Sequence, residues 1–341
     1  MDSIGFDLHK THSQICVLTS GAAWIERRIR TTRESLSKFF SDRPTSRILL
    51  ESSTESEWVA RFLEELGHEV VVGDPNFAPM YSRRYRRIKT DRRDARALAE
   101  ACRVGAYRPA HRVSDASYRI RVQLRARRSL VHCPGKLINQ IRSLLRHEGI
   151  HLPAGQPMRF LIRLSILDIP TWLVVEMQPV LGQIALLNEK IAEADARLGE
   201  LAKKHEVMRR LMTVPGVGPV TAATFVSTID DITRFDSAQE VRAYLGLVPR
   251  ELSSGERQRR GVVTKAGNRW ARTALVEAAW STRRSRHGVA LRVWTDRVAQ
   301  RRGRRKAIVA LARKVAGILY AIWRDEAVFS LETSAGQSAA A

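Results

Sequence analysis

Cysteine and long apolar runs are both scarce in this sequence of 341 residues. The three cysteines are an odd number and lack the paired spacing of a disulfide framework or a zinc finger, which excludes both: they are Cys16, Cys102 and Cys133. The apolar stretches, such as residues 48–50 and 70–72, fall far short of the roughly 18 residues that a membrane span needs. The first residues lack the basic head and long apolar middle of a signal peptide. We therefore expect a cytoplasmic protein with no membrane partner.

Acidic residues are also outnumbered, with 35 Asp+Glu against 58 Lys+Arg and a formal net charge of +23. Hydrophobic residues make up 44% of the chain, enough to bury the cores of two or three domains, so a mainly disordered chain is excluded. The net charge is −3 over residues 1–80, +14 over 81–150, +1 over 151–210 and +11 over 211–341. Because Lys and Arg neutralise phosphates, the two basic blocks predict a nucleic-acid partner.

Strand and helix patterns alternate over the first hundred residues. We expect strands at residues 3–8, 14–18, 23–29, 47–51 and 69–73, and helices at 33–40 and 55–66. Three antiparallel strands followed by alternating helices and parallel strands outline a mixed sheet of the ribonuclease H type. The first region is therefore predicted to be an α/β domain over residues 1–110.

Helical periodicity dominates the rest of the chain. Residues 91–104, 116–148 and 171–205 are predicted helices, and the last two are long enough to form antiparallel arms or the seam of an oligomer. An apolar stripe on the last helix favours a seam between helices over a ligand site; it comprises Leu181, Ile184, Leu187, Ile191, Ala194 and Leu198. The predicted organisation continues with a helical linker and oligomerisation region, a mostly α C-terminal domain of short helices and a disordered tail, over residues 111–206, 207–328 and 329–341.

Four acids stand at the ends or starts of these predicted elements. Asp7 and Glu51 end two strands, and two acids ending central strands of such a sheet would meet at its carboxyl edge. Asp91 and Asp94 share one face of a helix start that Thr90 can cap, and taken alone these two are explained by favourable helix-start chemistry. Magnesium prefers oxygen ligands, and two ions can clamp the attacking and leaving oxygens of phosphoryl transfer. The four acids together therefore predict a site for Mg²⁺.

Two histidines, His9 and His12, lie close to Asp7 in the sequence. They suggest a pair of metal ligands, but histidines beside a strand end are more often solvated surface residues. We expect the surface role for both.

A Gly-x-Gly turn between two predicted helices lies at Pro215-Gly216-Val217-Gly218. Glycines there permit a positive φ and let backbone N–H groups at a helix start approach a phosphate. The segment resembles the helix-hairpin-helix element, which grips a nucleic-acid backbone without reading its sequence. The alternative is a tight corner between helices, and a lone Gly-x-Gly does not separate the two.

A serine-containing, arginine-rich loop interrupts the C-terminal helices at residues 252–261. Ser254 precedes a glycine and is followed by Arg257, Arg259 and Arg260, with Lys265 shortly beyond. A serine in such a loop can present its hydroxyl to a phosphodiester while the basic residues neutralise developing charge. No histidine stands nearby to act as its base, so by itself the loop is also consistent with an ordinary surface serine.

Together these segments resemble the DEDD-type transposases of the insertion-sequence 110 family, over nearly the whole chain from Ile4 to about Trp323. Five motifs in order carry the resemblance: Gly5-Phe6-Asp7, Leu50-Glu51, the Lys-Thr-Asp-Arg-Arg-Asp-Ala run at residues 89–95, Pro215-Gly216-Val217-Gly218, and the stretch 245–268 that contains Ser254-Gly255. The resemblance implies a RuvC-like domain with a ribonuclease H fold, a helical linker region and a C-terminal transposase domain.

The resemblance also implies roles for particular residues. Asp7, Glu51, Asp91 and Asp94 would hold Mg²⁺, and Ser254 would attack the scissile phosphate of DNA to give a covalent phosphoserine intermediate. Ser254 is chosen over its neighbour Ser253 because the family's serine directly precedes glycine. The family further implies a bridge RNA that pairs with donor and target DNA, and a homo-oligomer, either a dimer or a tetramer, in which subunits complete one another's sites.

Two other functions remain open on the residues alone. A RuvC-like nuclease or junction resolvase would use the same acids to direct water and would leave Ser254 with a structural role. A non-catalytic nucleic-acid-binding protein would need the basic blocks but not the four acids.

Overall fold

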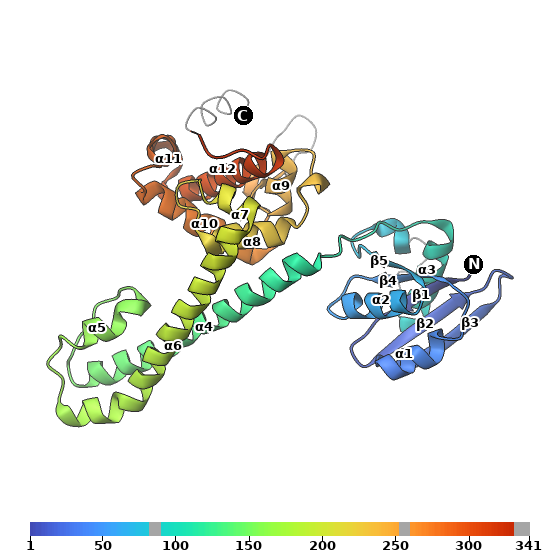
Figure 1. Ribbon diagram of the computed structural model, residues 1–341, viewed down its shortest axis with the longest axis horizontal. Coiled ribbons are helices and arrows are strands. Elements are labelled where there is room, and N and C mark those ends of the chain that lie inside the picture. Colours follow the sequence, from blue (N-terminus) through green and yellow to red (C-terminus); the bar gives the residue numbers. More distant parts are fainter. Residues whose placement is uncertain (82–89, 252–259, 331–341) are drawn as a thin grey trace. The chain divides into compact units, whose positions relative to one another are not determined.

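The computed structural model describes residues 1–81, 90–251 and 260–330 of the chain (Figure 1). The chain divides into two compact units, residues 1–112 and 113–341. The boundary between the two units lies two residues from the predicted end of the α/β domain. Residues predicted as linker and as C-terminal domain fall together in the second unit.

A five-stranded mixed sheet forms the centre of the first unit, with the strands in the order β3-β2-β1-β4-β5. The strands are β1 (Ser3–Asp7), β2 (His12–Leu18), β3 (Trp24–Arg30), β4 (Arg47–Glu51) and β5 (Glu69–Gly73). Strand β1 is antiparallel to β2 and parallel to β4, which is itself parallel to β5. The predicted α/β class and mixed sheet are therefore confirmed, with strand ends within two residues of those expected.

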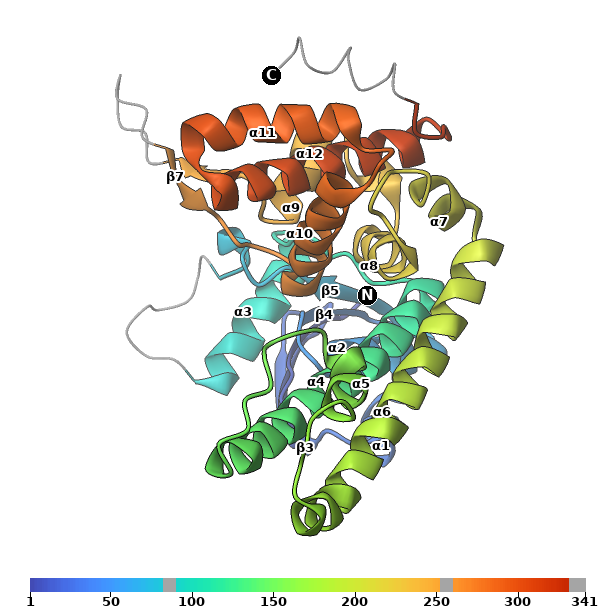
Figure 2. The ribbon, with the colours of Figure 1, turned by 90° about the vertical axis from the view of Figure 1, so that its left-hand side faces the viewer.

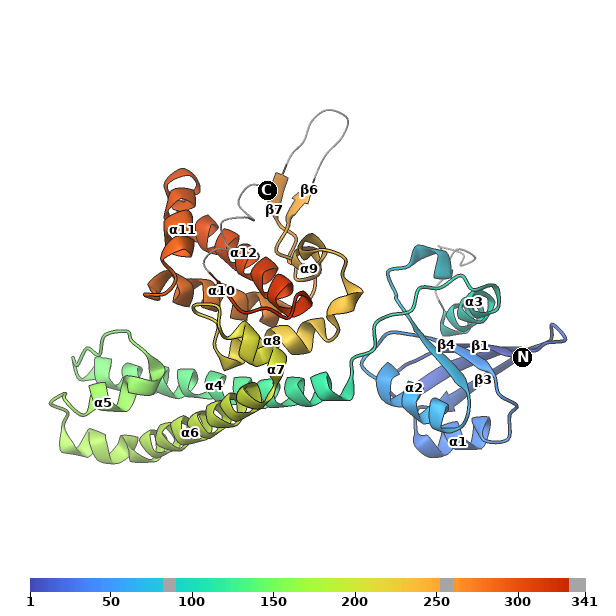
Figure 3. The ribbon, with the colours of Figure 1, turned by 45° about the horizontal axis from the view of Figure 1, so that its top comes forward.

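Helices cover both faces of this sheet (Figure 3). They are α1 (Arg33–Phe40), α2 (Ser56–Glu65) and α3 (Asp91–Val104), with a short 3-10 helix η1 at Ala78–Tyr81. Because side chains alternate along a strand, Ile4 and Phe6 of β1 point into one core, which is shared with Leu36 and Leu63 of α1 and α2. Gly5 faces the other side of the sheet, where α3 packs against β1, β2 and β4.

A long helical hairpin opens the second unit (Figure 1). It pairs α4 (Asp115–His147) with α6 (Thr171–Lys204), and between them lie η2 (Pro157–Arg159) and α5 (Phe160–Leu164). The apolar stripe predicted on α6 divides between two places in this hairpin. Ile184 belongs to a cluster with Ile141 and Phe160 toward the α5 end, while Leu198 joins the core of the C-terminal helices. The interpretation as antiparallel arms is therefore confirmed.

The remaining helices pack around one hydrophobic core, which also takes in Ile120 and Leu124 from α4. In order they are α7 (Glu206–Leu211), α8 (Pro219–Ile229), η3 (Ile232–Arg234), α9 (Ala238–Tyr244), α10 (Arg269–Arg284), α11 (Val289–Arg302) and α12 (Arg304–Arg324). Figure 2 shows α11 lying alongside α12. Several of these helices are longer than the short helices that the sequence predicted.

A two-stranded antiparallel sheet also lies in this part of the chain, where the sequence predicted only helices and a loop (Figure 3). It pairs β6 (Pro249–Glu251) with β7 (Arg260–Val263). Strands of three and four residues are too short to show an alternating pattern, which is why the prediction missed them.

Among the helices that the structure describes, none combines the length and apolar character that crossing a membrane requires. The predicted disordered tail lies, from residue 331 onward, outside the described residues.

Candidate metal centre and nucleic-acid interface

Asp7 ends β1 on the side of the sheet that faces α3. It lies on the same face as Gly5, two residues earlier, because strand side chains alternate. The residue is only 9% exposed, and its Oδ2 atom accepts no hydrogen bond from any described residue. A buried carboxylate oxygen in this state is costly without a cation or a proton.

Glu51 ends the neighbouring parallel strand, β4. Phe6 pairs with Leu50 in the register of the two strands, so the next residue of each strand lies at the same edge of the sheet. The predicted meeting of Asp7 and Glu51 at the carboxyl edge follows directly from this register.

Asp91 and Asp94 enter the same region from the first turn of α3. The Thr90 hydroxyl accepts a hydrogen bond from the Arg93 amide and caps the helix, as the sequence predicted. The Asp91 side chain is 59% exposed, whereas Asp94 is buried. The α3 start therefore brings one solvated and one buried carboxylate to the edge where β1 ends.

The pKa of Asp7 reflects its burial and the neighbouring acids. Burial raises it from its ordinary 3.8 to about 6, and the charges of Asp91, Asp94 and Glu51 add to the increase, while His9 opposes it. All four predicted acids are thus close enough to interact electrostatically.

His9 lies closer to two of the acids than the sequence indicated. Its side chain is 53% exposed, as expected, but its Nε2 atom lies 3.4 Å from Asp7 Oδ2 and 3.6 Å from Asp91 Oδ1. Ligand atoms of Asp7, His9 and Asp91 all lie within 4.8 Å of one another, a spacing that could hold a metal ion. The nearest sequence signal was its position two residues after the strand-end acid. His12 begins β2, where it pairs with Arg30 of β3, and has no part in this group.

The arginines that alternate with the acids on α3 are directed elsewhere. Arg92 and Arg96 both form ion pairs with Glu26 of β3, whose side chain is 9% exposed. Burial alone would raise the pKa of Glu26, but the two arginines hold it below its ordinary value. These two arginines are therefore paired with Glu26.

Ser254, Ser253, Arg257 and Arg259 lie outside the described residues, so the structure does not place the predicted nucleophile. The ends of that loop are described. The Thr264 amide donates to Val248 O at 2.8 Å, and the Lys265 amide donates to Gly246 O at 3.1 Å. Arg260 begins β7, and Lys265 is exposed and has a positive φ.

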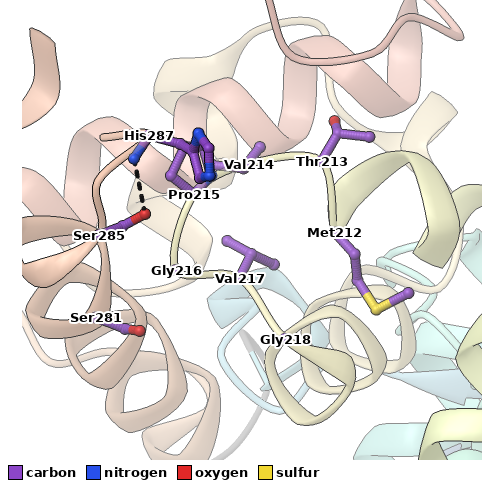
Figure 4. A pocket seen from close by; sticks show the side chains of 10 residues that line it. All are labelled: Met212, Thr213, Val214, Pro215, Gly216, Val217, Gly218, Ser281, Ser285 and His287. Carbon is purple, nitrogen blue, oxygen red and sulfur yellow. Dashed lines mark hydrogen bonds between the residues drawn. The ribbon is translucent and has the colours of Figure 1, made fainter. Parts of the chain in front are cut away.

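The Gly-x-Gly segment lines a pocket of about 430 Å³ between the α7–α8 connection and the end of α10 (Figure 4). Gly216 has a φ of +85°, and a Cβ there would come within 2.3 Å of the Thr282 amide nitrogen. Close packing on α10 therefore explains Gly216 without a ligand. Gly218 begins α8 with no side-chain cap, and a Cβ added to it would meet nothing within 4 Å. Ser285 and His287 line the opposite side.

Family models and similar proteins both identify this chain as similar to transposases. A transposase model of the DEDD type found in IS110 elements matches residues 4–149, and the model of the IS116/IS110/IS902 transposase family matches residues 208–293. The transposase for insertion sequence element IS1328 of Yersinia enterocolitica is 28% identical over 335 residues, which cover 96% of this chain and 98% of that protein. The y4pF/y4sB protein of Sinorhizobium fredii is 31% identical over 328 residues, which cover 93% of this chain and 82% of that protein. This chain belongs to the IS110 family of transposases.

A third relative, the transposase for insertion sequence element IS1111A of Coxiella burnetii, is 33% identical over 242 residues, which cover 69% of this chain and 66% of that protein. The family resemblance predicted from the motifs is confirmed. The protein is thus an IS110-family transposase, an enzyme of DNA recombination.

The second unit of this IS110-family transposase carries a group of arginines that we call the arginine row. It consists of Arg121, Arg125 and Arg128 of α4, Arg234 of η3, and Arg269 and Arg272 of α10. Burial lowers the pKa of Arg121; Tyr244 and Asp230 oppose this, and the charges of Arg125 and Arg234 add to the lowering. Burial and Arg125 likewise lower the pKa of Arg128. These arginines therefore lie close enough to repel one another.

Backbone oxygens and aromatic rings hold members of the arginine row. Arg121 Nε donates to Ser227 O at 2.7 Å, and the guanidinium of Arg128 lies 3.7 Å from the centre of the Trp270 ring. The charge of Asp230 acts on Arg121, whereas the pKa values of Arg128 and Arg272 are lowered by burial and by other arginines of the row. A group of arginines that exceeds its neighbouring carboxylates suits a polyanion such as a nucleic-acid backbone.

Proposed function

We propose that this IS110-family transposase cleaves and rejoins DNA through the Ser254 hydroxyl, assisted by Mg²⁺ held by Asp7, Glu51, Asp91 and Asp94. The observation that carries the proposal is the convergence of these acids around the buried Oδ2 atom of Asp7, which accepts no hydrogen bond from the described residues. A RuvC-like fold of the first unit is part of the same proposal, supported by the mixed sheet and by acids at two adjacent strand ends.

The acids fit a magnesium site on their chemistry. They offer carboxylate oxygens, the ligands that Mg²⁺ prefers, from two strand ends and one helix start. When bound, Mg²⁺ would neutralise charge that develops on the scissile phosphate. The protein's own contribution is to hold the carboxylates at one edge of a rigid sheet and to keep Asp7 buried.

The proposed chemical step exchanges one phosphodiester for another. The Oγ–P bond to Ser254 forms as the bond from phosphorus to the 3′ oxygen of the DNA breaks. The serine proton passes to solvent, and the released 3′ oxygen takes up a proton to become a hydroxyl. A 3′ hydroxyl from another strand then attacks the phosphoserine, reverses these bond changes and restores the serine.

Sequence choice is proposed to come from a bridge RNA that pairs with donor and target DNA. The protein would then need to hold nucleic-acid backbones rather than read bases. The arginine row supports this role, because clustered guanidinium groups neutralise phosphates in a way that does not depend on sequence. Gly218, Arg257, Arg259, Arg260 and Lys265 are proposed as further backbone contacts.

Assembly into a dimer or tetramer is also proposed, with the acids of one subunit serving the serine of another. Support comes from the α5 end of the helical hairpin, where large apolar side chains are exposed: Ile162 by 67%, Ile166 by 80%, Trp172 by 59% and Val175 by 60%. Exposed apolar side chains at one end of a hairpin are typical of a protein–protein contact.

Denaturing gels of donor DNA cleavage test the nucleophile. The wild type should form a covalent protein–DNA adduct with Mg²⁺, Ser254→Ala should form none, and Ser253→Ala should retain it. An adduct in Ser254→Ala would show that the assignment is wrong. Free 5′-phosphate ends and no adduct in the wild type would instead indicate a RuvC-like nuclease that uses water.

The acids are tested in the same assay. Asp7→Asn should abolish cleavage and preserve binding of nucleic acid, since Asp7 is at the proposed metal site and not in the arginine row. Loss of binding rather than of cleavage in this variant would favour a non-catalytic nucleic-acid-binding protein.

A further inference from the structure

His9 lies between two of the four acids at the edge of the sheet. Its Nε2 atom is 3.4 Å from Asp7 Oδ2 and 3.6 Å from Asp91 Oδ1. Both separations exceed the length of a good N–H···O hydrogen bond, about 2.7 to 3.2 Å. A cation with ligand bonds of about 2.1 Å would hold neighbouring ligand atoms roughly 3.0 to 3.5 Å apart. The two separations from His9 are therefore closer to those between ligands of one cation than to a hydrogen bond, and all three atoms lie within 4.8 Å of one another.

The Asp7 carboxylate points to the same conclusion independently. The residue is 9% exposed, and no described residue donates a hydrogen bond to its Oδ2 atom. A buried carboxylate oxygen needs a partner. A cation shared with His9 Nε2 would supply one at the atom that lacks it.

The backbone of His9 is fixed by buried hydroxyl groups although its ring is half exposed. The Thr31 hydroxyl donates to His9 O at 2.7 Å, and the His9 amide donates to Ser13 Oγ at 3.3 Å. The two hydroxyl oxygens also lie 2.7 Å apart, and Ser13 is 1% and Thr31 8% exposed. This arrangement joins the turn after β1 to β2 and to the residue after β3. It holds the His9 backbone at the strand end, which limits where the ring can go.

We propose that His9 is a nitrogen ligand of a divalent cation held by Asp7 and Asp91, and that this position consequently binds Mn²⁺ more tightly than Mg²⁺. The inference rests on the metal site of the proposed function and deepens it by assigning a ligand outside the four acids. Imidazole suits transition metals, whereas Mg²⁺ prefers oxygen ligands and keeps several waters. A site of two carboxylates and one imidazole therefore favours Mn²⁺ over Mg²⁺ more strongly than a purely carboxylate site would.

The experiment measures metal binding on the full-length, metal-free protein rather than activity. Calorimetry gives the affinities for Mn²⁺ and, in separate titrations, Mg²⁺, and pulsed electron paramagnetic resonance of bound Mn²⁺ detects a coordinated nitrogen. The variants are His9→Ala and, as a matched control, His12→Ala, since His12 is an exposed histidine three residues away that has no part in the group. Both rings are solvated, so neither change opens a cavity.

The wild type and His12→Ala should show a nitrogen signal and prefer Mn²⁺. His9→Ala should lose the signal and bind Mn²⁺ about tenfold or more weakly, while its affinity for Mg²⁺ changes by less than about threefold. Mn²⁺ binding that requires Asp7 but has no nitrogen signal, or the same affinities in His9→Ala, would overturn the inference and leave the metal site intact. Mn²⁺ binding unchanged in Asp7→Asn would instead show that the proposed metal site itself is wrong.

Discussion

Gly5 of β1 lies directly against the backbone of Ala95 in α3: a Cβ on Gly5 would come within 2.0 Å of the Ala95 carbonyl oxygen. Only glycine allows the helix to pass so close to the strand at this point. Asp7 lies two residues further along the same face, and Asp94 immediately precedes Ala95. The close crossing of β1 and α3 therefore sets how near the strand acid comes to the helix acids.

Gly5→Ala should destabilise the first unit, because the methyl group must displace helix backbone rather than a flexible side chain. Overpacking typically costs about 1 to 3 kcal/mol, and contact with backbone places this change at the upper end of that range or above it. Urea unfolding measures the change in stability. Gly199→Ala in α6 is the control, since a Cβ there meets nothing within 4 Å, and it should stabilise by about 0.5 to 1 kcal/mol. Equal effects of the two changes would contradict the argument.

Asp7→Asn should stabilise the metal-free protein at neutral pH. The pKa of Asp7 is raised to about 6 in the folded protein, so the folded state holds the proton more tightly than the unfolded chain. The contribution of Asp7 to stability therefore falls as pH rises from about 4 to about 6, by at most about 3 kcal/mol. Urea unfolding in chelator at pH 4 and pH 7 should show this fall in the wild type and a smaller one in Asp7→Asn.

The control for this prediction is Asp42→Asn, which changes an exposed acid of the same unit and should leave the pH dependence as it is in the wild type. Adding Mg²⁺ or Mn²⁺ should stabilise the wild type and Asp42→Asn but not Asp7→Asn. A pH dependence that is the same in all three proteins would show that Asp7 does not titrate as described.

Arg125→Gln combined with Arg128→Gln should weaken binding of nucleic acid similarly across sequences. Removing one arginine that neutralises a phosphate lowers the slope of log K against log salt by about 0.9 for duplex DNA, so the double change should lower it by about 1.8. Affinities measured by fluorescence anisotropy at several salt concentrations give this slope. Arg127→Gln is the matched control, because Arg127 lies on the same helix and is paired with Asp195. A slope that falls equally in the control would argue against the arginine row.

Trp172→Ser combined with Ile166→Ser should reduce self-association, because both side chains are exposed at the α5 end of the helical hairpin. Sedimentation velocity should show a shift toward the monomer. Tyr118→Ser removes a side chain that is 54% exposed near the start of α4 and should leave the oligomeric state unchanged. An unchanged distribution in the double variant would place the oligomer contact elsewhere.

Local patterns were sufficient to predict the first unit. The apolar residues of β1 and β4, the Thr90 cap and the acids at the two strand ends are all set within a few residues of sequence, and the parallel register then brings Asp7 and Glu51 to one edge. The approach of His9 to Asp91 was not predictable in this way. It depends on where the start of α3 lies against β1, which is a tertiary contact that no local pattern encodes.

The C-terminal motifs show a different limit. Gly216 was conspicuous in the sequence because glycine suits a phosphate contact, yet it packs on Thr282, and Gly246 of the motif stretch 245–268 packs on the backbone of Ala266. Asn268 of the same stretch caps α10 by accepting from the Trp270 amide at 2.8 Å. A glycine required by packing and one required by a ligand look alike until the neighbouring backbone is known.

The helical hairpin buries its apolar residues in two separate groups, one around Ile141, Phe160 and Ile184 and the other around Leu124 and Leu198. Pro134 stands in α4 between Leu124 and Ile138, where it removes a backbone hydrogen bond of the helix. The outer group completes its core without residues of the inner one. We therefore expect the outer segment of this hairpin to tolerate lengthening, shortening or exchange while the C-terminal core keeps its contacts.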